Sequence, residues 1–115
     1  MSSRWFNMSK QQLTSIEDFN AIVESTPAFL LIKHSITCPI SANAFEEYEK
    51  FTEKSDFPTF YLYVQEARPL SNYIAETYGV KHESPQALIF ADRKVKWHTS
   101  HWNITEKSLQ EAIEK

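Results

Sequence analysis

Residues 28–34, AFLLIKH, form a short and almost continuous apolar run, and no other segment constrains the fold as strongly. A run of this length is too short for a buried helix, whereas a strand covered on both faces of a sheet needs few polar positions. We therefore predict a central strand here. The segment TFYLYV at residues 59–64 has aromatic and branched side chains throughout, and it predicts a second central strand.

Segments with apolar residues at helical spacing flank these strands. Ser15 can cap the first of them, because Asp18 follows three residues later in a pattern like a capping box. Pro39 suits the first turn of a helix, where a missing N–H costs nothing. Gly79 stands where a glycine commonly ends a helix. The predicted helices lie between Ser15 and Pro27, from Pro39 to about Lys54, from Pro69 to Gly79, and after Thr105.

A β-hairpin is predicted after the third helix. Its strands are QALIFA at residues 86–91 and KVKWHT at residues 94–99, with a turn at Asp92-Arg93. Strands joined by a helix pair in parallel, whereas a hairpin is antiparallel. The sequence therefore predicts an α/β fold with a thioredoxin-like outline: a four-stranded mixed central sheet with helices on both faces. We expect residues 1–115 to form one domain, with residues 1–13 as a docked arm.

The bulk composition argues against several classes of function. The net charge is −3 and there is no Lys/Arg cluster, which argues against nucleic acid or an anionic membrane as partner. The N-terminal segment lacks the apolar run of a signal peptide, and no 18-residue apolar stretch follows it. A single cysteine cannot form an internal disulfide. We therefore expect a cytoplasmic protein, and we expect a monomer.

No spacing of metal-ligating side chains resembles a zinc site. His34 lies four residues before the only cysteine, and His98 and His101 lie far along the chain. We expect His34 to end a strand. The other two histidines stand beside tryptophans, and we expect them to form a solvated rim of the hairpin. The sequence therefore predicts no bound metal.

The motif TCPIS at residues 37–41 contains the only cysteine, Cys38. Cys38 follows a predicted buried strand and precedes a predicted helix, whose free N–H groups and dipole favour an anion. A thiol in this position should have a pKa below the ~8.5 of free cysteine, and its thiolate is the nucleophile in thiol–disulfide exchange. The alternative is an inert cysteine, because free cysteine is among the most buried residue types.

Two further positions bear on this chemistry. Ser41 stands three residues after Cys38, where a dithiol motif has its second cysteine. Its hydroxyl can bond backbone N–H groups, or the Cys38 thiolate, or both. Pro85 precedes the strand at residues 86–91, in a loop that faces the active cysteine of a thioredoxin-like fold. A cis proline there presents the backbone of Ser84 to an extended substrate, whereas a trans proline would simply begin a strand.

The chain resembles the monothiol bacilliredoxin-like family of the bacillithiol system, which has a thioredoxin fold. The resemblance rests on FLLIKHSITCPISANAFEEYEKF and YIAETYGVKHESPQALIF. It implies a monothiol disulfide reductase that acts on bacillithiolated client proteins, with bacillithiol as co-substrate and no bound cofactor. It also implies a set of site residues: Cys38 as nucleophile, Thr37, Pro39, Ile40 and Ser41 as its active loop, and Ser84 and Pro85 as the substrate-facing element.

Three functions stay open at this point. In the first, the Cys38 thiolate takes bacillithiol from a client and a second bacillithiol acts as the resolving thiol. In the second, the chain is a non-catalytic binding or redox-sensing module whose Cys38 is modified by bacillithiol without turnover. In the third, Cys38 is buried and the chain is an interaction protein. A dithiol route is excluded, because the chain has no second cysteine.

Overall fold

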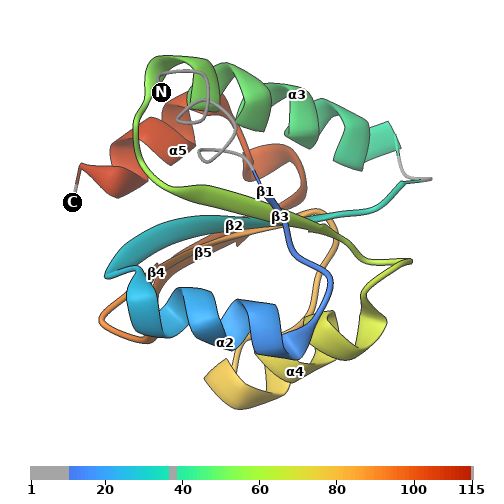
Figure 1. The fold of residues 1–115 in the computed structure, drawn as a ribbon. Coiled ribbons are helices and arrows are strands. Elements are labelled where there is room, and N and C mark those ends of the chain that lie inside the picture. The colour runs from blue at the N-terminus through green and yellow to red at the C-terminus, as the bar shows by residue number, and fades with distance from the viewer. Residues whose placement is uncertain (1–10, 37–38, 115) are drawn as a thin grey trace.

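A five-stranded mixed sheet, in the strand order β1-β3-β2-β4-β5, lies at the centre of the fold (Figure 1). The computed structural model describes residues 11–36 and 39–114. The strands are β1 (Gln11–Gln12), β2 (Ala28–His34), β3 (Thr59–Tyr63), β4 (Gln86–Ala91) and β5 (Lys94–Ser100). The helices are α2 (Ile16–Ser25), α3 (Pro39–Lys54), α4 (Arg68–Tyr78) and α5 (Glu106–Ile113), with the short 3-10 helix η1 (His101–Asn103).

The helices cover both faces of the sheet. α2 and α4 pack on one face, and α3 and α5 pack on the other (Figure 1). β2 pairs in parallel with β3 and antiparallel with β4, and β4 and β5 form an antiparallel hairpin. The predicted α/β architecture, a mixed sheet with helices on both faces, is confirmed. The predicted number of four strands is wrong by one.

The additional strand is β1, which lies in the segment predicted to be a docked arm. β1 pairs in parallel with β3, and the N–H of Leu13 donates to the carbonyl of Tyr61 over 2.8 Å. Both glutamines of β1 are exposed. Sequence patterns miss such a strand, because two polar residues show no alternation and join the sheet through backbone hydrogen bonds. The rest of the predicted arm, residues 1–10, lies outside the described residues.

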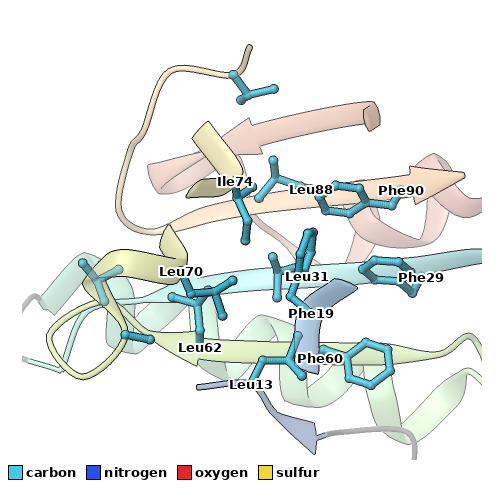
Figure 2. Packing of buried hydrophobic residues seen from close by; sticks show 13 residues of the cluster. Leu13, Phe19, Phe29, Leu31, Phe60, Leu62, Leu70, Ile74, Leu88 and Phe90 are labelled. Carbon is cyan, nitrogen blue, oxygen red and sulfur yellow. The ribbon is translucent and has the colours of Figure 1, made fainter. Parts of the chain in front are cut away.

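An aromatic cluster fills the space between the sheet and α2 (Figure 2). Phe29 of β2 stacks on Phe90 of β4 with ring centroids 4.8 Å apart, and Phe19 of α2 meets Phe90 edge to face at 5.5 Å. All three side chains are buried. Aromatic pairs in these geometries contribute about 0.5–1.5 kcal/mol each beyond the burial of their area. The cluster therefore binds β2 and β4 together beneath α2.

The predicted cap and turn signals are confirmed. The Ser15 hydroxyl accepts a hydrogen bond from the N–H of Asp18 at 3.0 Å, and Thr105 caps α5 in the same way. Gly79 ends α4 in the left-handed conformation, with φ of 66°. Residues 92–93 also have positive φ angles, as the tight turn of a two-residue hairpin requires.

Lys33 is a charged residue in the middle of this sheet. It pairs with β3 on one side and with β4 on the other, and none of its surface is exposed. Its Nζ donates to the backbone carbonyl of Ser71 at 3.2 Å and lies 3.4 Å from Nδ1 of His82. Burial lowers the pKa of Lys33 from 10.5 to about 8, because the charged form loses its water. The protonated side chain therefore costs stability at neutral pH.

We expect Lys33→Met to raise the free energy of unfolding at about pH 7. A pKa moved from 10.5 to about 8 corresponds to roughly 3 kcal/mol, at about 1.4 kcal/mol for each pH unit. Replacing a buried charge by an apolar side chain of similar volume is often stabilising by about 1–4 kcal/mol. Urea denaturation of the wild type and the variant measures the gain.

The pH dependence supplies the control for this experiment. Below about pH 8 both the folded and the unfolded chain carry Lys33 protonated, so the cost is present in full. As the pH rises toward 10.5, the folded chain loses this proton first and the cost disappears. The stability difference between variant and wild type should therefore shrink from about pH 7 to about pH 9.5. If the variant were less stable than the wild type at neutral pH, protonated Lys33 would not be a cost to stability.

Candidate functional site

The predicted site residues that the structure describes lie near the end of β2 and the start of β4. β2 ends at His34, and the preceding Lys33 pairs with Gln86, the first residue of the antiparallel strand β4. The segment that follows β2 and the segment that leads into β4 are therefore neighbours. Thr37 and Cys38 lie outside the described residues. Of the others, Pro39, Ile40 and Ser41 begin α3, and Ser84 and Pro85 lead into β4.

Two polar side chains hold the residues that lead from β2 toward the TCPIS motif. Gln65, in the loop between β3 and α4, accepts from the N–H of Ile36 at 3.1 Å and donates to the hydroxyl of Ser35 at 2.8 Å. The fully buried hydroxyl of Ser41 accepts from the N–H of Ser35 at 3.2 Å. Ser41 thus binds a backbone N–H, as predicted, but that N–H belongs to the end of the strand rather than to the helix.

The loop ahead of β4 is held at both of its ends. The Ser84–Pro85 peptide bond is cis, the isomer that the predicted fold favours. Pro85 is buried, and its carbonyl accepts from the N–H of His101 at 3.0 Å. The side-chain amide of Gln86 donates to the carbonyl of Lys81 at 2.9 Å, which closes the loop upon itself. η1 and β4 therefore position Pro85 from two directions.

His34 ends β2, as predicted. Its ring packs against Phe45 of α3, with centroids 4.6 Å apart, and against Tyr63 of β3 at 5.4 Å. Burial lowers the pKa of His34 below its usual 6.5, and the backbone of Ser41 and the carboxylate of Glu49 oppose part of this effect. The imidazole at this edge is therefore neutral at pH 7.

Three buried polar atoms have no hydrogen-bond partner within the described part of the chain. They are Nδ1 of His34, Oγ of Ser84 and Oε1 of Gln86. All three belong to residues at the edge where β2 ends and β4 begins. Buried polar atoms are nearly always paired, and redox and catalytic sites are among the places where unpaired ones are found. Their concentration marks this edge as the candidate site.

Two large apolar side chains in residues 11–36 and 39–114 are strongly exposed: Ile36 at 52% and Trp102 at 63%. Ile36 is the last described residue before the TCPIS motif. Trp102 belongs to η1, whose first residue binds the carbonyl of Pro85. Both apolar groups therefore flank the candidate site, where exposed apolar surface commonly serves protein recognition.

Two further histidines were predicted to form a solvated rim. His98 and His101 are exposed, as predicted, and Nδ1 of His101 lies 3.6 Å from a carboxylate oxygen of Glu83. In the described ranges, no group of three or more His, Cys, Asp or Glu residues could hold a metal ion. Across the same residues, no helix has the length and apolar character needed to span a membrane.

The family model of monothiol bacilliredoxin BrxC matches residues 11–109, which include the whole candidate site. The chain belongs to the monothiol bacilliredoxin family. Membership confirms the resemblance seen in the sequence. It also implies thiol–disulfide oxidoreductase chemistry of the bacilliredoxin type, in which bacillithiol takes part.

Solved structures confirm the thioredoxin-like fold of this bacilliredoxin. A candidate oxidoreductase with a thioredoxin fold is 41% identical, with a TM-score of 0.88 over 95% of this chain and 97% of that one. Thioredoxin f from spinach chloroplast (long form) is 18% identical, with a TM-score of 0.75 over 98% and 92%. A mutant thioredoxin from Halobacterium salinarum is 19% identical, with a TM-score of 0.73 over 92% and 88%.

Sequence reasoning missed two side chains that shape this site. Gln65 is an exposed loop residue 30 positions from Ser35, and no local pattern relates the two. Lys33 did leave a signal, because a lysine inside an apolar strand run needs a polar partner. That partner, His82, lies 49 positions away and could be named only from the structure.

We expect Gln65→Ala to release the segment that precedes the TCPIS motif while leaving the fold intact. The variant removes the acceptor of the Ile36 N–H, whereas the Ser35 N–H keeps its bond to Ser41. Amide hydrogen exchange should therefore accelerate at Ile36 and change little at Ser35. Global stability should fall by no more than about 1 kcal/mol, because the lost bonds are exposed.

Ser41→Ala is the matched control, because it removes the acceptor of the Ser35 N–H and leaves the bond between Gln65 and Ile36 in place. It should accelerate exchange at Ser35 and cost about 1–3 kcal/mol of stability, because it leaves a partly buried N–H without its acceptor. If both variants accelerate exchange at the same amide, Gln65 and Ser41 do not hold Ile36 and Ser35 separately, and this assignment of the hydrogen bonds is wrong.

Proposed function

We propose that this bacilliredoxin is a monothiol oxidoreductase that removes bacillithiol from protein mixed disulfides, with Cys38 as its nucleophile. The observation that carries the proposal is that the chain is held in place on both sides of Cys38, by hydrogen bonds before it and by a helix after it. Gln65 and Ser41 hold residues 35–36, and α3 begins at Pro39. Family membership supports bacillithiol as the co-substrate and bacillithiolated proteins as the partners.

The proposed reaction consists of two thiol–disulfide exchanges. The Cys38 thiolate attacks the bacillithiol sulfur of the client's mixed disulfide, and the client cysteine leaves as a thiolate. A new disulfide then joins Cys38 to bacillithiol. The thiolate of a second bacillithiol attacks the bacillithiol sulfur of this adduct and releases Cys38 as a thiolate. The products are the reduced client and oxidised bacillithiol, and the second bacillithiol supplies the reducing electrons.

α3 supports a lowered pKa for the Cys38 thiol. The helix is 16 residues long and begins at the residue after Cys38, and its first turn has no acidic side chain. The free N–H groups and the dipole at a helix N-terminus favour a thiolate over a thiol. In this proposal the helix activates the cysteine without a neighbouring base.

The remaining site residues position the substrate in this proposal. Thr37, Pro39 and Ile40 shape the active loop, and Ser84 and Pro85 face the incoming disulfide. The topology of the sheet supports these roles. The start of α3 follows the end of β2, and the loop ahead of β4 leads to the same edge of the sheet. The bond between the His101 N–H and the Pro85 carbonyl keeps that loop in place for binding.

The exposed apolar side chains support a protein client as the substrate. Ile36 and Trp102 flank the candidate site and offer an apolar surface that a small polar thiol does not need. Tryptophan is among the residues that contribute most to protein recognition. We assign these two side chains to contact with the client polypeptide around its modified cysteine.

Cys38→Ser should abolish the release of bacillithiol from a bacillithiolated client protein. In the wild type, the rate of Cys38 alkylation plotted against pH should have an inflection below 8.5, because the thiolate is the reacting form. Mass spectrometry after exposure to oxidised bacillithiol should show one adduct, on Cys38.

Two results would contradict this function. An inflection at or above 8.5 would remove the activation step. An adduct on Cys38 without turnover of the client would instead identify a redox-sensing module on the same fold. The first result tests the activation of Cys38, and the second separates the reductase from the sensor.

Trp102→Ser should raise KM for a bacillithiolated client protein. It should leave unchanged the second-order rate constant with which oxidised bacillithiol forms its adduct on Cys38. The reason is that only the protein substrate reaches beyond the reacting disulfide to the apolar surface. Truncation of a tryptophan that is an interface hot spot costs about 2 kcal/mol or more, which predicts a rise in KM of at least about 30-fold. The control is Glu111→Ala, an exposed position of α5, which should change neither value. Equal effects of Trp102→Ser on both substrates would refute the client surface.

A further inference from the structure

Lys33, Ser71 and His82 form a polar cluster that the proposed exchange steps do not use. Nδ1 of His82 lies 3.1 Å from the hydroxyl of Ser71 and 3.4 Å from Nζ of Lys33, and Nζ also donates to the carbonyl of Ser71 at 3.2 Å. Lys33 and Ser71 are buried, whereas His82 belongs to the exposed loop ahead of β4. The cluster therefore ties that loop to the interior of the sheet.

The cluster fixes which nitrogen of His82 bears the proton. An ammonium group has three donors and no acceptor, so Nδ1 beside protonated Lys33 must act as an acceptor. A hydroxyl alone could either donate or accept and would leave the tautomer open. The neutral ring must then carry its hydrogen on Nε2. Within the described residues no partner to Nε2 is found, so this N–H is available to a ligand.

The surrounding charges keep His82 neutral and favour an anionic ligand. Burial lowers the pKa of His82 first, then the charges of Lys33 and Arg68 lower it further, and only Glu83 opposes them. A neutral N–H donor in a field of two cations suits a carboxylate oxygen better than a neutral carbonyl. His82 lies two residues before Ser84, in the loop assigned to the incoming disulfide.

We propose that Lys33 is a positioning residue that locks His82 as an Nε2–H donor, and that this donor binds a carboxylate of the incoming disulfide substrate. The proposal rests on the proposed function for the identity of that substrate. It also explains why a buried cation that costs stability stands in the central strand. Ser71 completes the cluster by fixing the orientation of both Lys33 and His82.

The first experiment measures the tautomer in the protein itself. The full chain, labelled with ¹⁵N and carrying Cys38→Ser so that no covalent adduct forms, is studied by histidine side-chain NMR at about pH 7. His82 should bear its hydrogen on Nε2. In a second protein that also carries Lys33→Met, the Nδ1–H form should become measurable. A predominant Nδ1–H form in the protein that retains Lys33 would overturn the proposal.

The second experiment measures binding of oxidised bacillithiol, which carries carboxylates, to the same Cys38→Ser protein. His82→Ala removes one hydrogen bond to the carboxylate, and it should raise the Kd by about 2- to 10-fold. His98→Ala, which removes another exposed histidine, should leave it unchanged. Neither variant should change binding of bis(2-hydroxyethyl) disulfide, which has no carboxylate.

The outcomes separate the sources of the carboxylate and separate this inference from the proposed function. An effect of His82→Ala on oxidised bacillithiol assigns the carboxylate to bacillithiol. An effect seen only with a bacillithiolated peptide that has glutamate beside its cysteine assigns it to the client. No effect with either ligand refutes the inference, even if the wild type reduces clients. If the wild type binds through His82 but does not reduce clients, the proposed function fails and the binding role stands.

Discussion

The enclosure of β2 is the constraint on which the rest of the structure depends. This strand is paired on both edges, by β3 and by β4, and helices cover both of its faces. Phe29 and Leu31 enter one core cluster, whereas Leu30 and Ile32 enter the other. Because every side chain has a fixed neighbour, the end of the strand is fixed as well. The candidate site begins where this enclosure ends, at His34.

Most of the architecture could be predicted from local sequence, because local physics decides it. The run AFLLIKH, the capping residue Ser15 and the αL residue Gly79 each specify their element without knowledge of distant residues. β1 could not be predicted, because its pairing uses the backbone and leaves no mark on residue choice. Cys38, Ser41 and Pro85 could be nominated from sequence, since motif and topology place them. Gln65 and His82 could not, because Gln65 lies 30 positions from Ser35 and His82 lies 49 positions from Lys33.

The hydrogen bonds of Gln65 and the polar cluster around Lys33 have different effects on stability. The bonds of Gln65 join exposed or half-buried groups and contribute little free energy, so their effect is to restrict where residues 35–36 can lie. Lys33 lowers stability, because its charge is buried with hydrogen-bonding partners but, among residues 11–36 and 39–114, without a counter-ion. The aromatic cluster on the same face is one of the favourable contributions that offset this cost. Packing in the core thus compensates for the buried Lys33, which contacts the exposed His82.

Ser41 stands where a dithiol motif has its second cysteine, and its side chain takes part in holding the end of β2. Its hydroxyl is fully buried and accepts the N–H of Ser35, so the position three residues after Cys38 is already part of the framework. A thiol at this position is a weaker acceptor than a hydroxyl and would hold the strand end less firmly. In the proposed reaction, this serine helps to hold the segment that precedes Cys38 and offers no internal resolving group. A chain built in this way needs a resolving thiol that diffuses to the site, which is the role that bacillithiol has in the proposed reaction.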